Sequence, residues 1–273
     1  MWTKRDEAFW NELMNWEQQL VSNRDEKVEE QGALASKLAA SLPDDIKSRF
    51  FSQADQAAEW LWSFLQNDNL EAGVKNQIIG AARIFQDDIE TIDQLHRLTI
   101  DQLQYINRQR AFKNHAAAAI QGAASGTGNF IPALTDFLIL SAMQLRTIQT
   151  TALSYGFDTS LPFERENILH LFYISLLPES LKADGWAKLI TEVEEKTAYI
   201  DKESWGTNEA MLQEPMKHIL KLAAVRILRR PSGIPVISMA LSAGANFLAV
   251  KQATVFAERY YQYRYLYEKK NRE

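Results

Sequence analysis

The sequence predicts an all-α protein: a single multi-helix domain of 273 residues with glycine-rich helix–turn–helix corners and two apolar core helices. Apolar residues recur at three- and four-residue steps in nearly every segment, without sustained alternation of apolar and polar positions. Turn-forming residues interrupt this pattern at helix-length intervals. With 46% apolar and 24% charged residues, the chain has a globular composition and is long enough to bury a substantial core.

Residues 1–115 form the N-terminal helical part. An apolar stripe predicts a first helix of about 18 residues, and its members are Phe9, Trp10, Leu13, Met14, Trp16 and Leu20. The triplet Asn67-Asp68-Asn69 predicts a later helix boundary. Ile84–His115 is the longest stretch with an uninterrupted helical pattern, so we expect one long helix there.

Residues 116–175 form a second part, whose first segment reads GAASGTGNFIPALTDFLIL from Gly122. Gly122 and Gly126 are four residues apart, so they share one helix face and permit close approach of another backbone. Gly128 follows, and Pro132 suits the first turn of a helix because its missing N–H has no partner there. We expect a helix–turn–helix corner leading into an apolar core helix over residues 131–143.

Residues 214–273 form a basic C-terminal part with a similar segment, PSGIPVISMALSAGANFLAV from Pro231. Residues 234–250 contain no charge, although Asn246 interrupts the run, and Gly244 provides a close-approach position. As a helix this run is about 25 Å long against a hydrocarbon core of about 30 Å, which disfavours a span. We expect it to pack against residues 131–143; the sequence leaves open whether the two helices are buried in protein or meet lipid.

These segments resemble the EcsC family. The resemblance rests on Gly122–Leu140, the triplet Gln144-Leu145-Arg146, the block ALSYGFD from Ala152, and the Ile-Pro-Val step at residues 234–236 with the glycine and basic aromatic tail that follow it. It implies an all-helical bacterial protein from a family named for a protein encoded beside an ABC transporter. It implies no activity or catalytic residues. Ser238 and Met239 depart from the small residues common in the family at that point.

Nucleotide and metal chemistry find little support. Gly126 and Gly128 precede a helix, but no predicted strand comes before them and no Lys-Ser or Lys-Thr pair follows. Glu166 and His170 are one helical turn apart, yet no second pair completes a metal site. With no cysteine in the chain, disulfides and thiolate chemistry are excluded. We expect no cofactor and no metal.

Asp136 is the most unusual acid, because it interrupts an apolar helix where a carboxylate is costly to bury without a partner. Arg146 lies ten residues on, about 15 Å along the helix axis, so the two cannot pair directly. We expect a structural polar network here. The alternative is a carboxylate of an active site.

The strongest functional hint is the charge of residues 214–273, which carry eleven bases against four acids, although the whole chain has a net charge of −5. Bases and tyrosines beside an apolar run suit an anionic bilayer surface. A terminal helix that packs through Phe256, Tyr260, Tyr263 and Tyr267 is the alternative, and no nucleic-acid motif is present. The membrane-surface candidates are Lys217, Lys221, Arg226, Arg229, Arg230, Lys251, Arg259 and Arg264.

We therefore expect a non-catalytic cytoplasmic protein, attached peripherally to the inner face of the cell membrane and accessory to transport or envelope processes. Its expected partner is an anionic membrane surface or a membrane protein, and not nucleic acid; the sequence leaves the oligomeric state open. The alternative function is a hydrolase-like enzyme using Asp136 with Arg146, Tyr155 or His170. The expected structural or functional core comprises Gly122, Gly126, Gly128, Asp136, Arg146, Tyr155, Gly156, Gly244 and Asn246.

Overall fold

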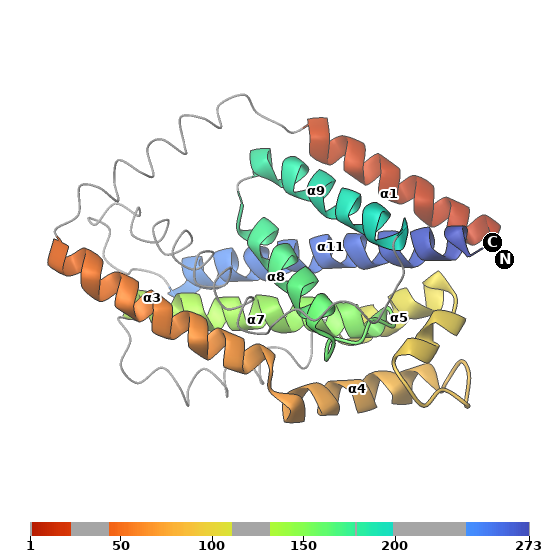
Figure 1. Cartoon of the computed structure of the whole chain (residues 1–273), viewed down its shortest axis with the longest axis horizontal. Coiled ribbons are helices and arrows are strands. Elements are labelled where there is room, and N and C mark those ends of the chain that lie inside the picture. The colour runs from red at the N-terminus through yellow and green to blue at the C-terminus, as the bar shows by residue number, and fades with distance from the viewer. Residues whose placement is uncertain (1, 23–43, 111–131, 178, 199–238, 273) are drawn as a thin grey trace.

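The computed structural model describes residues 2–22, 44–110, 132–177, 179–198 and 239–272, which contain helices and no strand (Figure 1). The all-α prediction is therefore confirmed. The elements are α1 (Lys4–Ser22), α3 (Asp44–Leu65), α4 (Asp68–Ala82), the 3-10 helix η1 (Asp93–Arg97), α5 (Ile100–Arg110), α7 (Pro132–Ser154), α8 (Pro162–Leu176), α9 (Glu179–Ala198) and α11 (Met239–Asn271).

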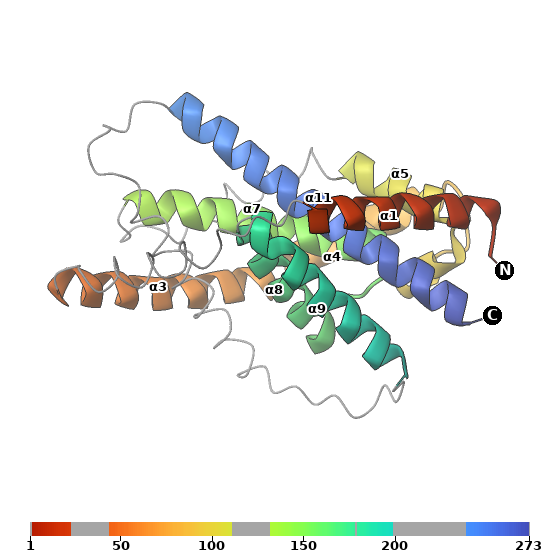
Figure 2. The same ribbon diagram turned by 90° about the horizontal axis from the view of Figure 1, so that it is seen from above.

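Two central helices organise the fold. α7 packs most extensively against α11, and both run along the long axis of the molecule in the same direction (Figure 1). Seen from above, the two helices cross at an angle (Figure 2). α3, α4 and α5 contact α7, while α1 and α9 contact α11 and each other. α8 contacts both central helices and α9, so it joins the two sides of the molecule.

Local sequence signals explain where helices begin. The Thr3 hydroxyl accepts a hydrogen bond from the Asp6 backbone N–H, and Asp6 accepts one from the Thr3 N–H at 2.8 Å, which forms a reciprocal cap at the start of α1. Asn67 caps α4 by accepting from the Leu70 N–H. Pro132 and Pro162 begin α7 and α8, where the absence of an N–H has no cost. Pro132 thus stands where the sequence predicted.

The prediction of a single long helix over residues 84–115 is wrong. α4 ends at Ala82, and turns and η1 intervene before α5 begins at Ile100. Polar side chains bind the backbone between them: Gln94 Oε1 accepts from the Glu90 N–H at 2.7 Å, and Arg83 Nε donates to the Ile89 carbonyl at 2.8 Å. Such side-chain bonds compete with helical ones, which periodicity of apolar residues does not reveal.

The core confirms the apolar stripe of the first helix and extends it across the molecule. Phe9, Leu13 and Leu20 are buried, and the tryptophans of α1 pack against the same core. α11 continues through the tyrosine-rich tail as one helix to Asn271, and Tyr260 and Tyr261 on it are almost completely buried. These tyrosine side chains are therefore core groups.

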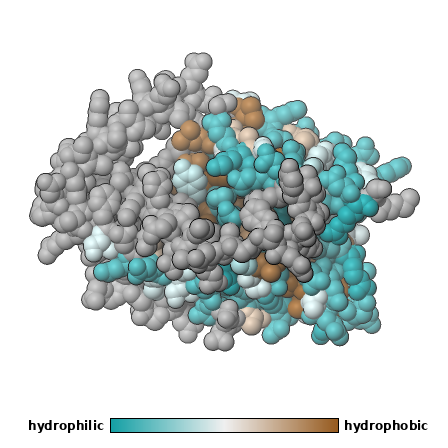
Figure 3. Space-filling model, viewed as in Figure 1, coloured by the Kyte–Doolittle hydropathy of each residue, from teal (hydrophilic) through white to brown (hydrophobic). Residues whose placement is uncertain are grey.

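In the part of the chain that the structure describes, no helix combines the length and apolar character needed to cross a bilayer. The described surface in Figure 3 is mainly hydrophilic, with hydrophobic residues in separate patches. Its large exposed apolar side chains include Leu161 and, lining one shallow surface cavity together, Ile84 and Tyr105.

Candidate functional site

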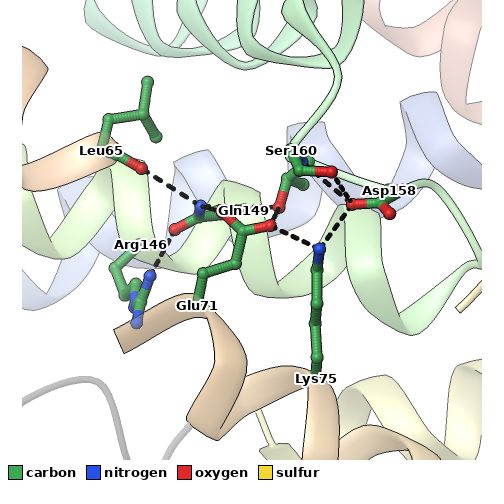
Figure 4. Close-up of polar contacts among 8 residues, drawn as sticks. Leu65, Glu71, Lys75, Arg146, Gln149, Asp158 and Ser160 are labelled. Carbon is green, nitrogen blue, oxygen red and sulfur yellow. Dashed lines mark hydrogen bonds and ion pairs between the residues drawn. The ribbon is translucent and has the colours of Figure 1, made fainter. Parts of the chain in front are cut away.

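A buried carboxylate lies at the centre of a polar cluster between α4 and α7 (Figure 4). Glu71 of α4 is 3% exposed. It accepts hydrogen bonds from Thr159 Oγ1 at 2.9 Å and Gln149 Nε2 at 3.2 Å, and its Oε1 lies 2.9 Å from Lys75 Nζ. A buried carboxylate is stable only when partnered in this way. Each Glu71 oxygen therefore has a defined role in holding the two helices together.

Lys75 connects this buried carboxylate to the surface. Its Nζ is also 2.6 Å from Asp158 Oδ1, and Asp158 accepts from the Ser160 N–H at 2.9 Å (Figure 4). Burial lowers the pKa of Lys75, but the hydrogen bonds to Asp158 and Glu71 outweigh it and leave the pKa raised. Burial likewise raises the pKa of Asp158, and Lys75 and Ser160 outweigh it to leave that pKa lowered. Both groups stay charged at neutral pH.

Arg146 lies at the inner end of the cluster and is 2% exposed. Its guanidinium donates to Gln149 Oε1, and the Gln149 amide donates onward to Glu71 and, at 3.4 Å, to the Leu65 carbonyl. Burial lowers the Arg146 pKa to about 10, with the Glu71 charge acting in the opposite direction. The side chain remains a cation, joined to its nearest carboxylate through an amide.

The turn after α7 connects this cluster to α11. Gly156 has φ of +89°, a left-handed conformation that suits glycine, and its backbone touches the His96 ring. Tyr155 is fully buried, and its hydroxyl accepts from Gln262 Nε2 of α11 at 3.1 Å. Burial raises the pKa of Tyr155 well above its usual value, so the phenol is neutral. The turn fixes the end of α7 against α11.

Arg264 of α11 forms a second buried ion pair. Its Nη1 lies 2.7 Å from Glu164 Oε1, and both side chains are buried. The guanidinium is also 4.0 Å from the centroid of the Phe157 ring. This position differs from the membrane-facing one expected for Arg264, because helix α11 turns that side of the basic tail into the core.

The profile of the EcsC protein family matches residues 7–266. The chain belongs to the EcsC family. No curated protein and no solved structure matches the chain. The matched span covers α4, α7, α8 and most of α11, so this EcsC protein's two buried ionic clusters both lie within the family region.

Among the residues of the hydrolase alternative, the structure describes the side chains of Arg146, Tyr155 and His170, and these three do not converge. Arg146 and Tyr155 are buried and bind different partners, Gln149 and Gln262. His170 is partly exposed, with Nδ1 3.5 Å from Glu192 Oε2. Neither described surface cavity is lined by these groups. Among the described residues, no group of three or more histidines and acids is arranged to hold a metal ion.

The structure describes some of the remaining expected site residues and not others. Gly156, Arg146 and Tyr155 belong to the interior of the EcsC fold as described above. Asp136 lies on α7, and Gly244 and Asn246 on α11, but their side chains lie outside the described part. Outside the described residues altogether are Gly122, Gly126, Gly128, Lys217, Lys221, Arg226, Arg229 and Arg230.

The two other basic candidates lie on α11. Lys251 is exposed. Arg259 is partly buried and lies 2.7 Å from Glu12 Oε1 of α1.

Sequence analysis missed Glu71, Lys75 and Glu164. Glu71 and Lys75 are spaced as a helical ion pair, which was a local signal available in the sequence. Glu164 occupies the first turn of α8, where an acid is common, so nothing local indicated a partner 100 residues along the chain.

Proposed function

We propose that this EcsC protein is a non-catalytic helical module that attaches to the anionic inner surface of the cytoplasmic membrane. The observation that carries the proposal is its charge segregation. Residues 214–273 carry eleven bases and four acids, a net charge of +7, in a chain whose total is −5. A local positive field of this kind attracts anionic headgroups even when the whole protein is acidic.

The basic residues of the segment 214–273 differ in the contacts that they make. In the second half of α11, Arg259 binds Glu12, Arg264 binds Glu164, and Lys269 Nζ lies 2.7 Å from Asp6 Oδ2. These three bases hold the fold together. Lys251, near the start of the described part of α11, is exposed. The proposal therefore assigns headgroup attraction to Lys251 and to the bases between residues 217 and 230.

The interior contacts support a non-catalytic role. A catalytic group must reach a substrate, whereas Arg146 and Tyr155 are 2% and 0% exposed and bind side chains within the fold. The family's name derives from a protein encoded beside an ABC transporter. We therefore assign the module an accessory role in transport or envelope processes, in which a membrane protein is its partner.

Co-sedimentation with vesicles tests the attachment. We expect the full chain to sediment with anionic vesicles at low salt, to be released at high salt, and to stay in solution with neutral vesicles. Changing Lys217, Lys221, Arg229 and Arg230 to glutamine should weaken binding at least tenfold, because each base near the surface is worth about 1 kcal/mol.

A matched variant separates location from total charge. Changing the exposed bases Lys4, Arg5, Arg108 and Lys188 to glutamine removes the same charge from α1, α5 and α9. This variant should bind like the parent. Equal weakening by both variants would show a general charge effect and reject the assigned surface, and the absence of binding at low salt would reject membrane attachment.

A further inference from the structure

A surface cavity lies where the end of α11 meets η1, beside the buried pair of Arg264 and Glu164. Its volume is about 360 Å³, large enough for a small organic ligand. Its walls come from two elements that are distant in the sequence. The charged and aromatic side chains that line it are His96, Arg97, Tyr265, Glu268, Lys269 and Arg272.

The charged lining is mainly positive. Arg97, Lys269 and Arg272 are permanent cations, and Glu268 is the one carboxylate among the lining residues. Glu268 Oε2 lies 3.2 Å from Arg272 Nη2, and its Oε1 lies 3.8 Å from Arg264 Nη2. One carboxylate is therefore shared between two guanidiniums. The end of α11 adds about half a negative charge, which is less than the charge of any one of the three bases.

Two of these cations, Arg97 and Arg272, can take a ligand anion with little loss of stability. Arg97 pairs with Asp88 at 2.7 Å, with side chains 47% and 59% exposed, and the Arg272 side chain is 64% exposed. Exposed ion pairs contribute little to stability, so a ligand anion can replace Asp88 beside Arg97. Glu268, 24% exposed, is shared with Arg264 and leaves Arg272 only partly balanced. Lys269 differs, because its carboxylate partner Asp6 is buried. It contributes a fixed charge to the cavity.

The aromatic wall has a defined geometry. The His96 and Tyr265 rings stack with centroids 6.2 Å apart and planes 6° apart, and the Tyr265 hydroxyl donates to the Leu98 carbonyl at 2.7 Å. Burial first, and then the charges of Arg272 and Arg264, lower the pKa of His96 to about 4. The imidazole is therefore neutral at physiological pH and adds no charge to the cavity.

We propose that this cavity binds a phosphate monoester, with the guanidiniums of Arg97 from η1 and Arg272 from the end of α11 both holding the phosphate. A guanidinium presents paired N–H donors that match two oxygens of one phosphate. A doubly charged anion balances both arginines, which a single carboxylate does not. The rigid stack of His96 and Tyr265 bounds the site beside the phosphate. This proposal does not depend on membrane attachment.

Isothermal titration calorimetry of the full chain with inorganic phosphate, against chloride at equal ionic strength, tests the site. We expect saturable binding that weakens about tenfold or more in Arg97→Gln and in Arg272→Gln. Arg5→Gln is the matched control, because Arg5 forms an exposed ion pair with Asp101 outside the cavity. It should bind phosphate like the parent. Circular dichroism and the melting temperature confirm that each variant is folded.

Two vesicle types of equal surface charge identify the source of the phosphate. Phosphatidic acid presents a phosphate monoester and phosphatidylglycerol a diester. A lipid source predicts stronger binding to phosphatidic acid that is lost in Arg97→Gln and Arg272→Gln; a soluble source predicts no difference between the vesicles. No saturable phosphate binding, or equal weakening in Arg5→Gln, would overturn the proposal. Loss of vesicle binding with retained phosphate binding would overturn only the membrane function.

Discussion

At the scale of single residues, three consecutive positions after α7 each make a different connection. Tyr155 reaches Gln262 of α11, Gly156 adopts a left-handed conformation against His96, and Phe157 lies 4.0 Å from the Arg264 guanidinium. The resemblance to the EcsC family singled out this block without a structural reason for it. The reason is that the turn joins the end of α7 to α11 and to η1.

Gly156→Ala should lower the free energy of unfolding by about 1–3 kcal/mol. The φ of +89° is strained for any residue with a Cβ, and that Cβ would lie 3.2 Å from the His96 ring. Urea denaturation measures the change. Gly80→Ala is the control, because Gly80 lies within α4 with nothing within 4 Å of an added Cβ. It should be neutral or stabilise by about 1 kcal/mol. A Gly156→Ala protein as stable as the parent would contradict the strain argument.

At the scale of elements, a buried ion pair joins the start of α8 to α11. Glu164 follows Pro162 in the first turn of α8 and meets Arg264, with both side chains below 10% exposed. The nearby Tyr260 and Tyr261 are buried, and burial raises the pKa of each, so the pair sits among neutral phenols. The Glu164 carboxylate is the closer of the two that balance Arg264 in this surrounding; Glu268 lies 3.8 Å away.

Glu164→Ala should lower the free energy of unfolding by about 3 kcal/mol, because it removes the carboxylate that lies 2.7 Å from buried Arg264 and leaves Glu268, at 3.8 Å, as its remaining described ion-pair partner. Asp88→Ala removes the partner of Arg97 in an exposed pair and should change the stability little. Thermal and urea unfolding compare the two. The double variant Glu164→Leu with Arg264→Met should regain most of the loss, since it removes the stranded charge. A double variant as unstable as Glu164→Ala would show that packing, and not charge, sets the cost.

At the scale of the whole molecule, the sequence predicted the helical class and the apolar stripe of α1 because both depend on local periodicity. The same periodicity wrongly predicted one continuous helix from Ile84 onward. In the structure this region contains turns, in which the side chains of Gln94 and Arg83 form hydrogen bonds with backbone groups. The clusters around Glu71 and Glu164 could not be predicted in this way. Their partners lie 88 and 100 residues away, and only the packed fold brings them together.

Acid should destabilise the molecule through His96. The pKa of this side chain falls from 6.5 to about 4 in the fold, so the unfolded chain binds a proton that the native state does not between these values. Its contribution is present above pH 6.5 and is lost as the pH falls toward 4, by on the order of 3 kcal/mol. The charged groups acting on it are Arg264 and Arg272 of α11 and Asp93 of η1.

Urea unfolding of the parent and of His96→Gln between pH 7 and pH 4 measures this contribution. The variant should show a flatter dependence across that range. Asp6 and Asp158 also have lowered pKa values, but their carboxyl groups titrate below 3.8 and so affect a more acidic range. Parallel curves for parent and variant would show that His96 does not set the acid response.

The contact between α1 and α11 has a consequence for synthesis on the ribosome. Lys269 and Asp6 are 263 residues apart, and translation at about 5–20 residues per second separates their emergence by roughly 13–50 s. During that interval the apolar stripe of α1 has no α11 to cover it. In the folded protein α11 also contacts α5, α7 and α8, so these helices lack the same partner until α11 is synthesised. Nascent EcsC chains should therefore depend on a holding chaperone until α11 leaves the exit tunnel, and native assembly should be completed after translation of that helix.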